Sequence, residues 1–286
     1  MRATSGSPFL VLGATGGQGG AVASALLALG APVRAMVRRP DAPSVRRLHE
    51  RGVEIVVGSL DDHNALGAAV RGVAGVFALT TPFDAGVDAE LAQGRAIVGA
   101  AIDEQVPHLV FSSVAGADQH TGVPHFESKA IIEAELTASG VPYTIAAPTY
   151  FFDNALGGTD RIHAGVLDLP LPPNRPLQQL ARPDLAAFVA KVLGNPEPYL
   201  GQRIELAGDA ATPAQMADVL SAALGHSVRH EQTPLDSIAN PDMHAMWQFL
   251  NGPGYRVDIE ALHAANPDIR WQSFAEWARH AFGPRS

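Results

Sequence analysis

The sequence predicts an α/β fold, a doubly wound parallel sheet followed by a smaller mixed C-terminal lobe. Between Pro8 and Ala147, short apolar runs rich in valine, leucine and isoleucine alternate with longer segments of helical apolar spacing. The pattern changes near Pro148, because prolines cluster at residues 169–176 and strand-like runs become fewer. We therefore expect residues 1–148 to form the sheet-containing domain. Residues 149–286 should form a smaller lobe that is interleaved with it rather than independent.

The first domain contains six strand-length runs, which predict six parallel strands. Strands that alternate with helices are typical of βαβ units, whose right-handed crossovers place helices on both faces of the sheet. The runs read FLVLGA, PVRAMVR, VEIVVG, VAGVFALT, HLVFSSV and PYTIAAP in chain order. The expected helices cover Ala21–Leu29, Ala65–Val70, Ala89–Ile102 and Lys129–Ala138.

Two helices are predicted in the C-terminal lobe. Thr212 suits an N-cap, Pro213 suits the first helical position, and Gln215 completes a capping box. Gly225 should end that helix. Near the C-terminus, apolar residues at helical spacing predict a helix that docks by its aromatic face. They are Trp271, Phe274, Trp277, Ala278 and Phe282.

Composition excludes several classes of function. The formal net charge is -9 and no basic run reaches five residues, which argues against a nucleic-acid partner. The chain has no cysteine, so disulfides, thiolate metal sites and cysteine nucleophiles are excluded. His108, His120 and His125 are near one another, but acids at metal-ligand spacing are lacking, and we expect no metal site. No G-x-S-x-G nucleophile motif occurs.

No targeting or membrane signal is visible. The apolar stretch near the N-terminus leads directly into a glycine-rich turn, unlike a signal peptide. No run of eighteen apolar residues is present. We expect a cytoplasmic protein without a membrane partner, and we leave open whether it forms a homodimer.

The stretch GATGGQGG follows the first predicted strand and precedes the first helix. Gly13, Gly16 and Gly19 form G-x-x-G-x-x-G, in which the glycines permit a tight turn, close backbone approach to a pyrophosphate, and close helix–strand packing. The helix N-terminus would then hold the phosphates. We expect a dinucleotide site, with contacts from Gly13, Thr15, Gly16, Gly17, Gln18 and Gly19.

The end of the second strand indicates which dinucleotide is preferred. A site for NAD usually carries an acidic residue there, but this strand is followed by Arg38 and Arg39. The guanidinium of Arg38 suits a 2′-phosphate. We therefore expect NADP(H) in preference to NAD(H), against the alternative of a solvated basic turn.

Three segments together resemble the NmrA-like branch of the atypical short-chain dehydrogenase/reductase superfamily, which has a Rossmann-type fold. They are GATGGQGG, VRAMVRRP and HFESKAIIEAELTASGVPYTIAAPTYFFDN. The later segment GQRIELAGDAATPAQMADVLSAALGHSV extends the resemblance over nearly the whole chain. The branch includes NADP(H)-sensing regulators and NADPH-dependent quinone reductases.

The resemblance implies a catalytic constellation of which this chain keeps only part. The superfamily's reductases use a serine with a Tyr-x-x-x-Lys pair. Lys129 matches the lysine, His125 stands in the tyrosine's place, and Ser112 and Ser113 follow the fifth strand where the serine belongs. Histidine side chains ordinarily titrate at about pH 6.5, so His125 is a candidate proton donor. The alternative is that His125 packs against or caps the start of its helix. The candidate catalytic residues are Lys129, His125, Ser113 and Tyr150.

Two loops at the carboxyl ends of strands are expected to meet the nicotinamide and its substrate. Thr80, Thr81 and Pro82 follow the fourth strand, and Pro148, Tyr150 and Phe151 follow the sixth. With Lys129, they complete the expected cofactor contacts. An aromatic or carbonyl substrate is expected against Phe83, Phe152 and Asn154, although some of these side chains should belong to the core.

Two functions stay open at this point. The first is an NADPH-dependent reductase of a quinone, ketone or conjugated aromatic compound, and the retained lysine and the aromatic cluster favour it. The second is a non-catalytic NADP(H) redox sensor that regulates a partner protein, and the missing tyrosine favours it.

Overall fold

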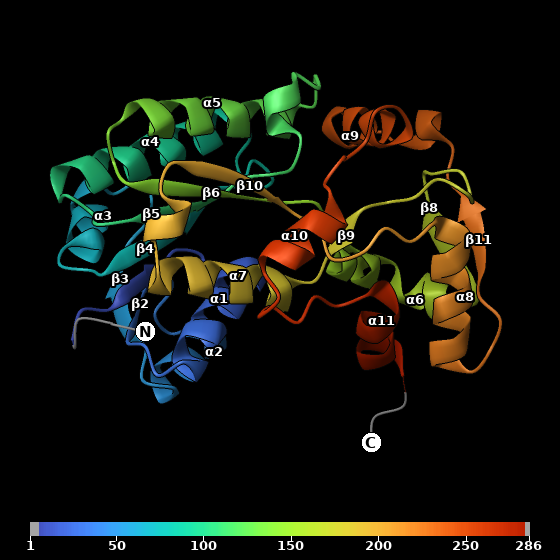
Figure 1. Cartoon of the computed structure of the whole chain (residues 1–286), viewed down its shortest axis with the longest axis horizontal. Helices are drawn as coiled ribbons and strands as arrows, with labels where there is room; N and C mark the ends of the chain where they lie inside the picture. Colours follow the sequence, from blue (N-terminus) through green and yellow to red (C-terminus); the bar gives the residue numbers. More distant parts are fainter. Residues whose placement is uncertain (1–5, 284–286) are drawn as a thin grey trace. The chain divides into compact units, whose positions relative to one another are not determined.

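A computed structural model describes residues 6–283, which fold into two compact units. Unit 1 comprises the chain up to Val114 together with Ser128–Ala147 and Leu185–Ile204. Unit 2 comprises Ala115–Glu127, Pro148–Asp184 and the chain from Glu205. The chain passes between the units several times, so neither unit is a single continuous segment (Figure 1).

A seven-stranded sheet forms the centre of unit 1, with the order β10-β6-β5-β4-β1-β2-β3. The six strands expected from the sequence pair in parallel, which confirms the doubly wound α/β fold. The seventh strand, β10, was not expected. The strands are β1 (Phe9–Val11), β2 (Val33–Val37), β3 (Glu54–Val57), β4 (Gly75–Leu79), β5 (Leu109–Ser112), β6 (Tyr143–Pro148) and β10 (Gln202–Leu206).

Helices cover both faces of this sheet, as Figure 1 shows. One face carries α3 (His63–Val70), α4 (Val87–Asp103) and α5 (Pro124–Ala138), whose apolar residues share a buried cluster with β1, β4 and β5. The other face carries α1 (Gly17–Ala28), α2 (Pro43–Glu50) and α7 (Arg182–Gly194).

The strand order reverses between β1 and β4, because the chain proceeds outward from β1 through β2 and β3 and then returns to β4 on the other side. In open parallel sheets, ligands bind outside the carboxyl ends of the strands at such a point. The turn after β1 reaches this edge: a Cβ added to Gly13 would lie 3.1 Å from the Leu79 side chain at the end of β4.

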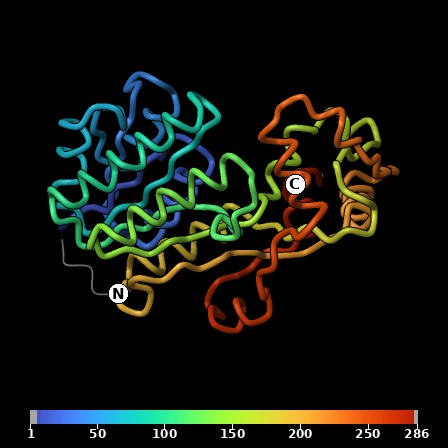
Figure 2. Tube along the Cα trace, turned by 90° about the horizontal axis from the view of Figure 1, so that it is seen from above, coloured from blue at the N-terminus to red at the C-terminus, as the bar shows by residue number. Residues whose placement is uncertain are grey.

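Unit 2 combines two short parallel strand pairs with helices. Figure 2 traces the course of the backbone. The pairs are β7 (Tyr150–Phe151) with β9 (Gln179–Leu180), and β8 (Val166–Leu169) with β11 (Arg229–Gln232). The helices are α6 (Thr159–His163), α8 (Pro213–Leu224), α9 (Pro241–Asn251), α10 (Ile259–Ala265) and α11 (Phe274–Phe282).

The local signals for α8 are confirmed. Thr212 and Gln215 form the reciprocal capping box, and Gly225 ends the helix in the left-handed region at φ 74°. For α11, Phe274, Trp277, Ala278 and Phe282 are buried as expected. The expectation that Trp271 shares that helical face is wrong, because α11 begins at Phe274 and the Trp271 ring stacks on His263 instead.

Candidate functional site

The turn after β1 has the geometry that a dinucleotide requires. Gly13 has φ +67°, and its carbonyl accepts a hydrogen bond from the Gly16 amide at 2.9 Å. A Cβ on Gly19 would lie 2.3 Å from that same carbonyl oxygen, so only glycine permits this packing of α1 on β1. No side chain caps α1, and its first turn has no acidic residue. Its N-terminal amides are therefore oriented to receive an anion, and the residues present fit a pyrophosphate.

Arg38 directly follows β2 and extends into solvent. Its guanidinium lies 3.8 Å from the carboxylate of Asp84, and both side chains are largely exposed. An exposed ion pair at this distance is weak, so it does not prevent the guanidinium from turning to a phosphate.

Lys129 is buried and belongs to a network of polar side chains, so it is not a surface lysine. Its Nζ donates to the carbonyl and the hydroxyl of Thr80 at 2.6 and 2.9 Å, and lies 3.0 Å from the carboxylate of Glu90. Thr80 and Ser128 also donate to Glu90, which is fully buried. Burial lowers the pKa of Lys129, and the charge of Glu90 opposes that shift.

The three donors of the Lys129 ammonium are therefore directed at groups within unit 1. The expected role of this lysine as a direct ribose ligand requires one of these contacts to be exchanged. In the structure, Lys129 binds Thr80 directly, the first residue of the loop Thr80, Thr81 and Pro82.

The two serines after β5 face different partners. Ser112 donates to the side chain of Gln18 in the glycine turn at 2.7 Å. The Ser113 hydroxyl donates to the buried Glu133, which also pairs with Arg203 at 2.8 Å. Successive residues of a strand point to opposite faces. Ser112, rather than the predicted catalytic Ser113, therefore contacts the dinucleotide turn.

His125 lies in the first turn of α5, four residues before Lys129. Its Nδ1 contacts the carboxylate of Asp242, which lies in the first turn of α9. Both side chains are half-buried. The neighbouring Phe126 packs against Phe249 and Tyr255, which fixes this end of α5 within unit 2. A carboxylate on one ring nitrogen sets the orientation and tautomer of a histidine, as in catalytic acid–base pairs.

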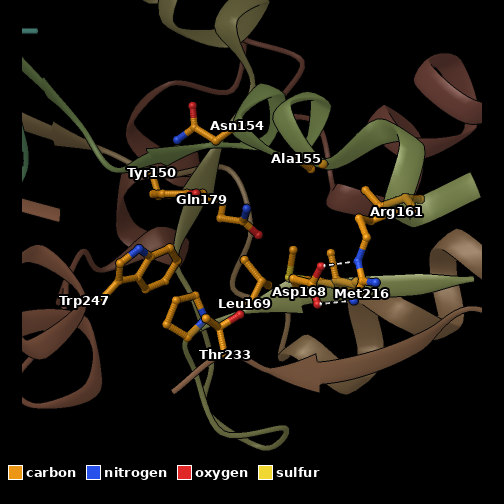
Figure 3. A pocket seen from close by; sticks show the side chains of 14 residues that line it. Tyr150, Asn154, Ala155, Arg161, Asp168, Leu169, Gln179, Met216, Thr233 and Trp247 are labelled. Carbon is orange, nitrogen blue, oxygen red and sulfur yellow. Dashed lines mark hydrogen bonds and ion pairs between the residues drawn. The ribbon is translucent and has the colours of Figure 1, made fainter. Parts of the chain in front are cut away.

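Unit 2 contains a cavity of about 290 Å³ in which Tyr150 and Asn154 come together (Figure 3). The Tyr150 ring lies 5.5 Å from the Trp247 ring, centroid to centroid. Burial raises the pKa of Tyr150 to about 12, partly opposed by a hydrogen bond with Asn154, so the phenol is neutral at physiological pH. Further lining residues are Ala155, Gly158, Arg161, Ile162, Leu167, Asp168, Leu169, Pro170, Gln179, Met216 and Thr233.

Several predicted site residues lie elsewhere. Phe152 is fully buried against Phe274 and Trp277 and does not line the cavity. The turn that follows Phe151 directs the Phe152 side chain into the unit 2 core, whereas Asn154 lines the cavity. Phe83 is 66% exposed in unit 1 and does not line the cavity.

Two more of the predicted cofactor contacts, Pro148 and Phe151, have backbone partners within unit 2. The carbonyl of Pro148 accepts from the Ala115 amide at 2.9 Å. Phe151 pairs with Leu180 in the short β7–β9 ladder.

Sequence reasoning missed Asp242, Trp247 and Gln179. Asp242 is 117 positions from His125, and no local pattern connects the two residues. Asp242 and Trp247 belong to one helix, α9, which therefore supplies both the partner of His125 and a wall of the cavity. Gln179 was not recognisable because it lies in a strand of only two residues.

Within residues 6–283, no helix is long and apolar enough to cross a membrane. In the same described part of the chain, no group of three or more histidine or acidic side chains is arranged to hold a metal ion.

Comparisons with known proteins agree with the fold. A model of the NmrA-like family matches residues 6–278. A (4-alkanoyl-5-oxo-2,5-dihydrofuran-3-yl)methyl phosphate reductase from Streptomyces griseus is 32% identical over 80% of this chain and 78% of its own. An NAD(P)H azoreductase from Xenophilus azovorans is 31% identical over 79% of this chain and 77% of its own. The structure of an NADPH-dependent quinone oxidoreductase from Escherichia coli, complexed with NADPH, superposes with a TM-score of 0.81 at 24% identity, covering 96% of this chain and 100% of that one.

Proposed function

Because the chain belongs to the NmrA-like family, we propose that it is an NADPH-dependent reductase of a quinone, ketone or conjugated aromatic compound. An NAD(P)H-dependent oxidoreductase is what its curated relatives indicate. The more specific proposal rests on the pairing of His125 with Asp242. His125 stands in the place of the family tyrosine, and the Asp242 carboxylate would orient its imidazole for acid–base chemistry.

The glycine turn and the residues around it would hold the cofactor. The α1 N-terminus would receive the pyrophosphate, and Arg38 would pair with the 2′-phosphate. The bound cofactor supplies a hydride to the substrate. Lys129 would act mainly by holding Thr80 in place, so we assign it a positioning role beside the nicotinamide loop rather than proton transfer.

His125 would deliver the proton that a reduced carbonyl requires. The contact between Nδ1 and the Asp242 carboxylate would orient the imidazole for this transfer. Tyr150 is a poorer candidate, because burial and its raised pKa of about 12 disfavour the phenolate that proton loss would leave. A quinone accepts a proton with less assistance than a ketone, so the two substrate types should depend differently on His125.

The unit 2 cavity would select the substrate. Trp247 and Tyr150 present ring surfaces to it, and Leu167, Leu169 and Met216 supply apolar wall. Such a lining suits a flat, mainly apolar compound.

A specific observation supports the alternative of a redox sensor. Ser113 donates to Glu133 and Lys129 pairs with Glu90, so two parts of the superfamily's catalytic constellation are directed at structural partners. A sensor would bind NADP(H) tightly without turnover, and its affinity for a partner protein would change with the cofactor.

Variants at the two acid–base positions test the proposal. We expect His125→Gln to lower kcat for a ketone substrate about a hundredfold, in the usual range for losing a general acid, with little change in the KM for NADPH. Asp242→Asn should lower kcat less, because it removes orientation rather than the proton donor. His120→Gln, at an exposed loop position, is the matched control. Unchanged kcat in His125→Gln would contradict the assignment.

A further inference from the structure

We propose that the unit 2 cavity recognises an uncharged, flat aromatic compound that carries a lactam, imide or primary carboxamide edge, and that the side chain of Gln179 pairs with this edge. The claim that such a compound is reduced rests on the proposed function. The claim that it binds here does not, because the cavity is built wholly from unit 2.

Gln179 is buried, yet its side chain has no hydrogen-bond partner among residues 6–283. It is 1% exposed, and within that part of the chain neither its amide nitrogen nor its amide oxygen makes a hydrogen bond. Its backbone, by contrast, is fully engaged: its amide donates to the Asp209 carbonyl at 2.8 Å, and its carbonyl accepts from the Gly208 amide at 2.7 Å. Leaving a buried amide unpaired is destabilising, so this side chain is held ready for a group that enters the cavity.

The adjacent Gln178 shows what such a carboxamide pairs with. Its Nε2 donates to the Val257 carbonyl at 2.8 Å, and its Oε1 accepts from the Val257 amide at 2.9 Å. One glutamine therefore binds the donor and the acceptor of a single residue's backbone. Gln179 has the same two groups, which could be matched by a ligand edge with one N–H and one carbonyl side by side.

Aromatic rings lie beside the Gln179 carboxamide. Tyr150 is the register partner of Gln179 in the parallel β7–β9 pair, so the two side chains emerge on the same face. Figure 3 shows the Tyr150 ring next to the Gln179 carboxamide, with Trp247 beyond it. A ligand that reaches Gln179 would therefore lie against aromatic surface, and a planar ring uses that surface best.

The charged residues of the cavity are already paired. Arg161 binds Asp168 through two contacts, at 2.8 and 3.1 Å, and also contacts Glu231 at 3.1 Å. The guanidinium is therefore neutralised by carboxylates and would not attract a phosphate or carboxylate ligand. This distinguishes the cavity from one that selects an anionic substrate, and its volume of about 290 Å³ suits a ligand of one or two fused rings.

Isatin and N-methylisatin test this inference, because both are flat and uncharged but only isatin has the lactam N–H. Titration calorimetry would use the full-length protein saturated with NADP⁺, so that no turnover occurs. We expect isatin to bind at least about tenfold more tightly than N-methylisatin, consistent with the loss of one buried hydrogen bond and the added methyl group. In Gln179→Leu the two affinities should agree within about twofold.

Gln178→Leu is the matched control, since it changes the neighbouring glutamine whose amide is already paired. It should keep the isatin preference and lower the Tm, whereas Gln179→Leu should have a Tm at or above that of the unsubstituted protein. Equal affinities in the unsubstituted protein, undetectable isatin binding, or a preference that persists in Gln179→Leu would each overturn the inference.

NADPH oxidation with 1,4-naphthoquinone separates this inference from the proposed function. An isatin preference without naphthoquinone turnover would support the Gln179 pairing and contradict the reductase. Turnover without an isatin preference would do the reverse.

Discussion

Two buried polar sites, one in each unit, differ in how their side chains are paired. In unit 1, Lys129, Glu90 and Thr80 form a network in which each charged or hydroxyl group meets a partner at hydrogen-bond distance. In unit 2, the side chain of the equally buried Gln179 makes no hydrogen bond to any residue that the structure describes.

The difference indicates that the paired side chains position a loop, whereas the unpaired side chain is available to recognise a ligand. A fully paired network fixes a loop in one geometry, and its members have few groups left for a ligand. A buried unpaired carboxamide lowers the stability of the folded protein, and this loss is recovered only when a complementary group binds. The Lys129 network therefore holds the loop after β4 in place, and the unpaired Gln179 is the group that we propose for ligand recognition in unit 2.

Breaking the unit 1 network should have the largest effect on stability. Lys129→Met leaves the Glu90 carboxylate buried without its cation, which should lower the free energy of unfolding by about 3–5 kcal/mol. Adding Glu90→Gln removes the charge and should restore much of that loss. Urea unfolding of the single and double variants measures both. A single-variant loss below about 1 kcal/mol would show that the ion pair contributes little.

The glycine turn should be the next most sensitive position. In Gly19→Ala the new Cβ would lie 2.3 Å from the Gly13 carbonyl oxygen, so the turn must open. We expect the Kd for NADPH to rise about a hundredfold, equivalent to about 2.7 kcal/mol. Gly99→Ala in α4 is the control, because a Cβ there meets nothing within 4 Å. Fluorescence titration should show an unchanged Kd for that variant.

A third prediction concerns pH and the unit 1 core. His108 is buried beside Thr144, and burial lowers its pKa to about 4. The unfolded chain therefore binds a proton that the folded protein resists between about pH 6.5 and 4, and stability falls as pH falls through that window. From pH 7 to pH 5 this residue should account for about 2 kcal/mol of the loss.

Comparing urea unfolding of His108→Asn with the unsubstituted protein at both pH values isolates this contribution. The asparagine variant should lose about 2 kcal/mol less on acidification. Equal losses in the two proteins would mean that His108 accepts its proton in the folded state.

The smallest predicted effect concerns cofactor preference. Arg38→Ser should weaken NADPH binding about tenfold, the scale of one exposed charged hydrogen bond, and change NADH binding less than twofold. Arg39→Ser should leave the NADPH-to-NADH ratio unchanged. If both arginine variants lower the affinity for the two cofactors equally, Arg38 does not read the 2′-phosphate.

The sequence predicted what depends on short-range pattern. The six parallel strands follow from apolar runs, and the turn at Gly13 follows from residues within one βαβ unit. Asp242 could not be connected with His125, because folding alone joins residues 117 positions apart. Phe152 and Asn154 illustrate the limit within one motif. They are two residues apart, yet the turn geometry places one in the core and the other at the cavity.

The central claim is that the protein is a reductase. Its most direct test is the number of NADPH molecules that each protein molecule oxidises with 1,4-naphthoquinone, measured by the loss of absorbance at about 340 nm. A reductase consumes many equivalents per protein and produces the hydroquinone, and this is the result we predict. Consumption of no more than one equivalent, with NADPH still tightly bound, would contradict the reductase and support the sensor.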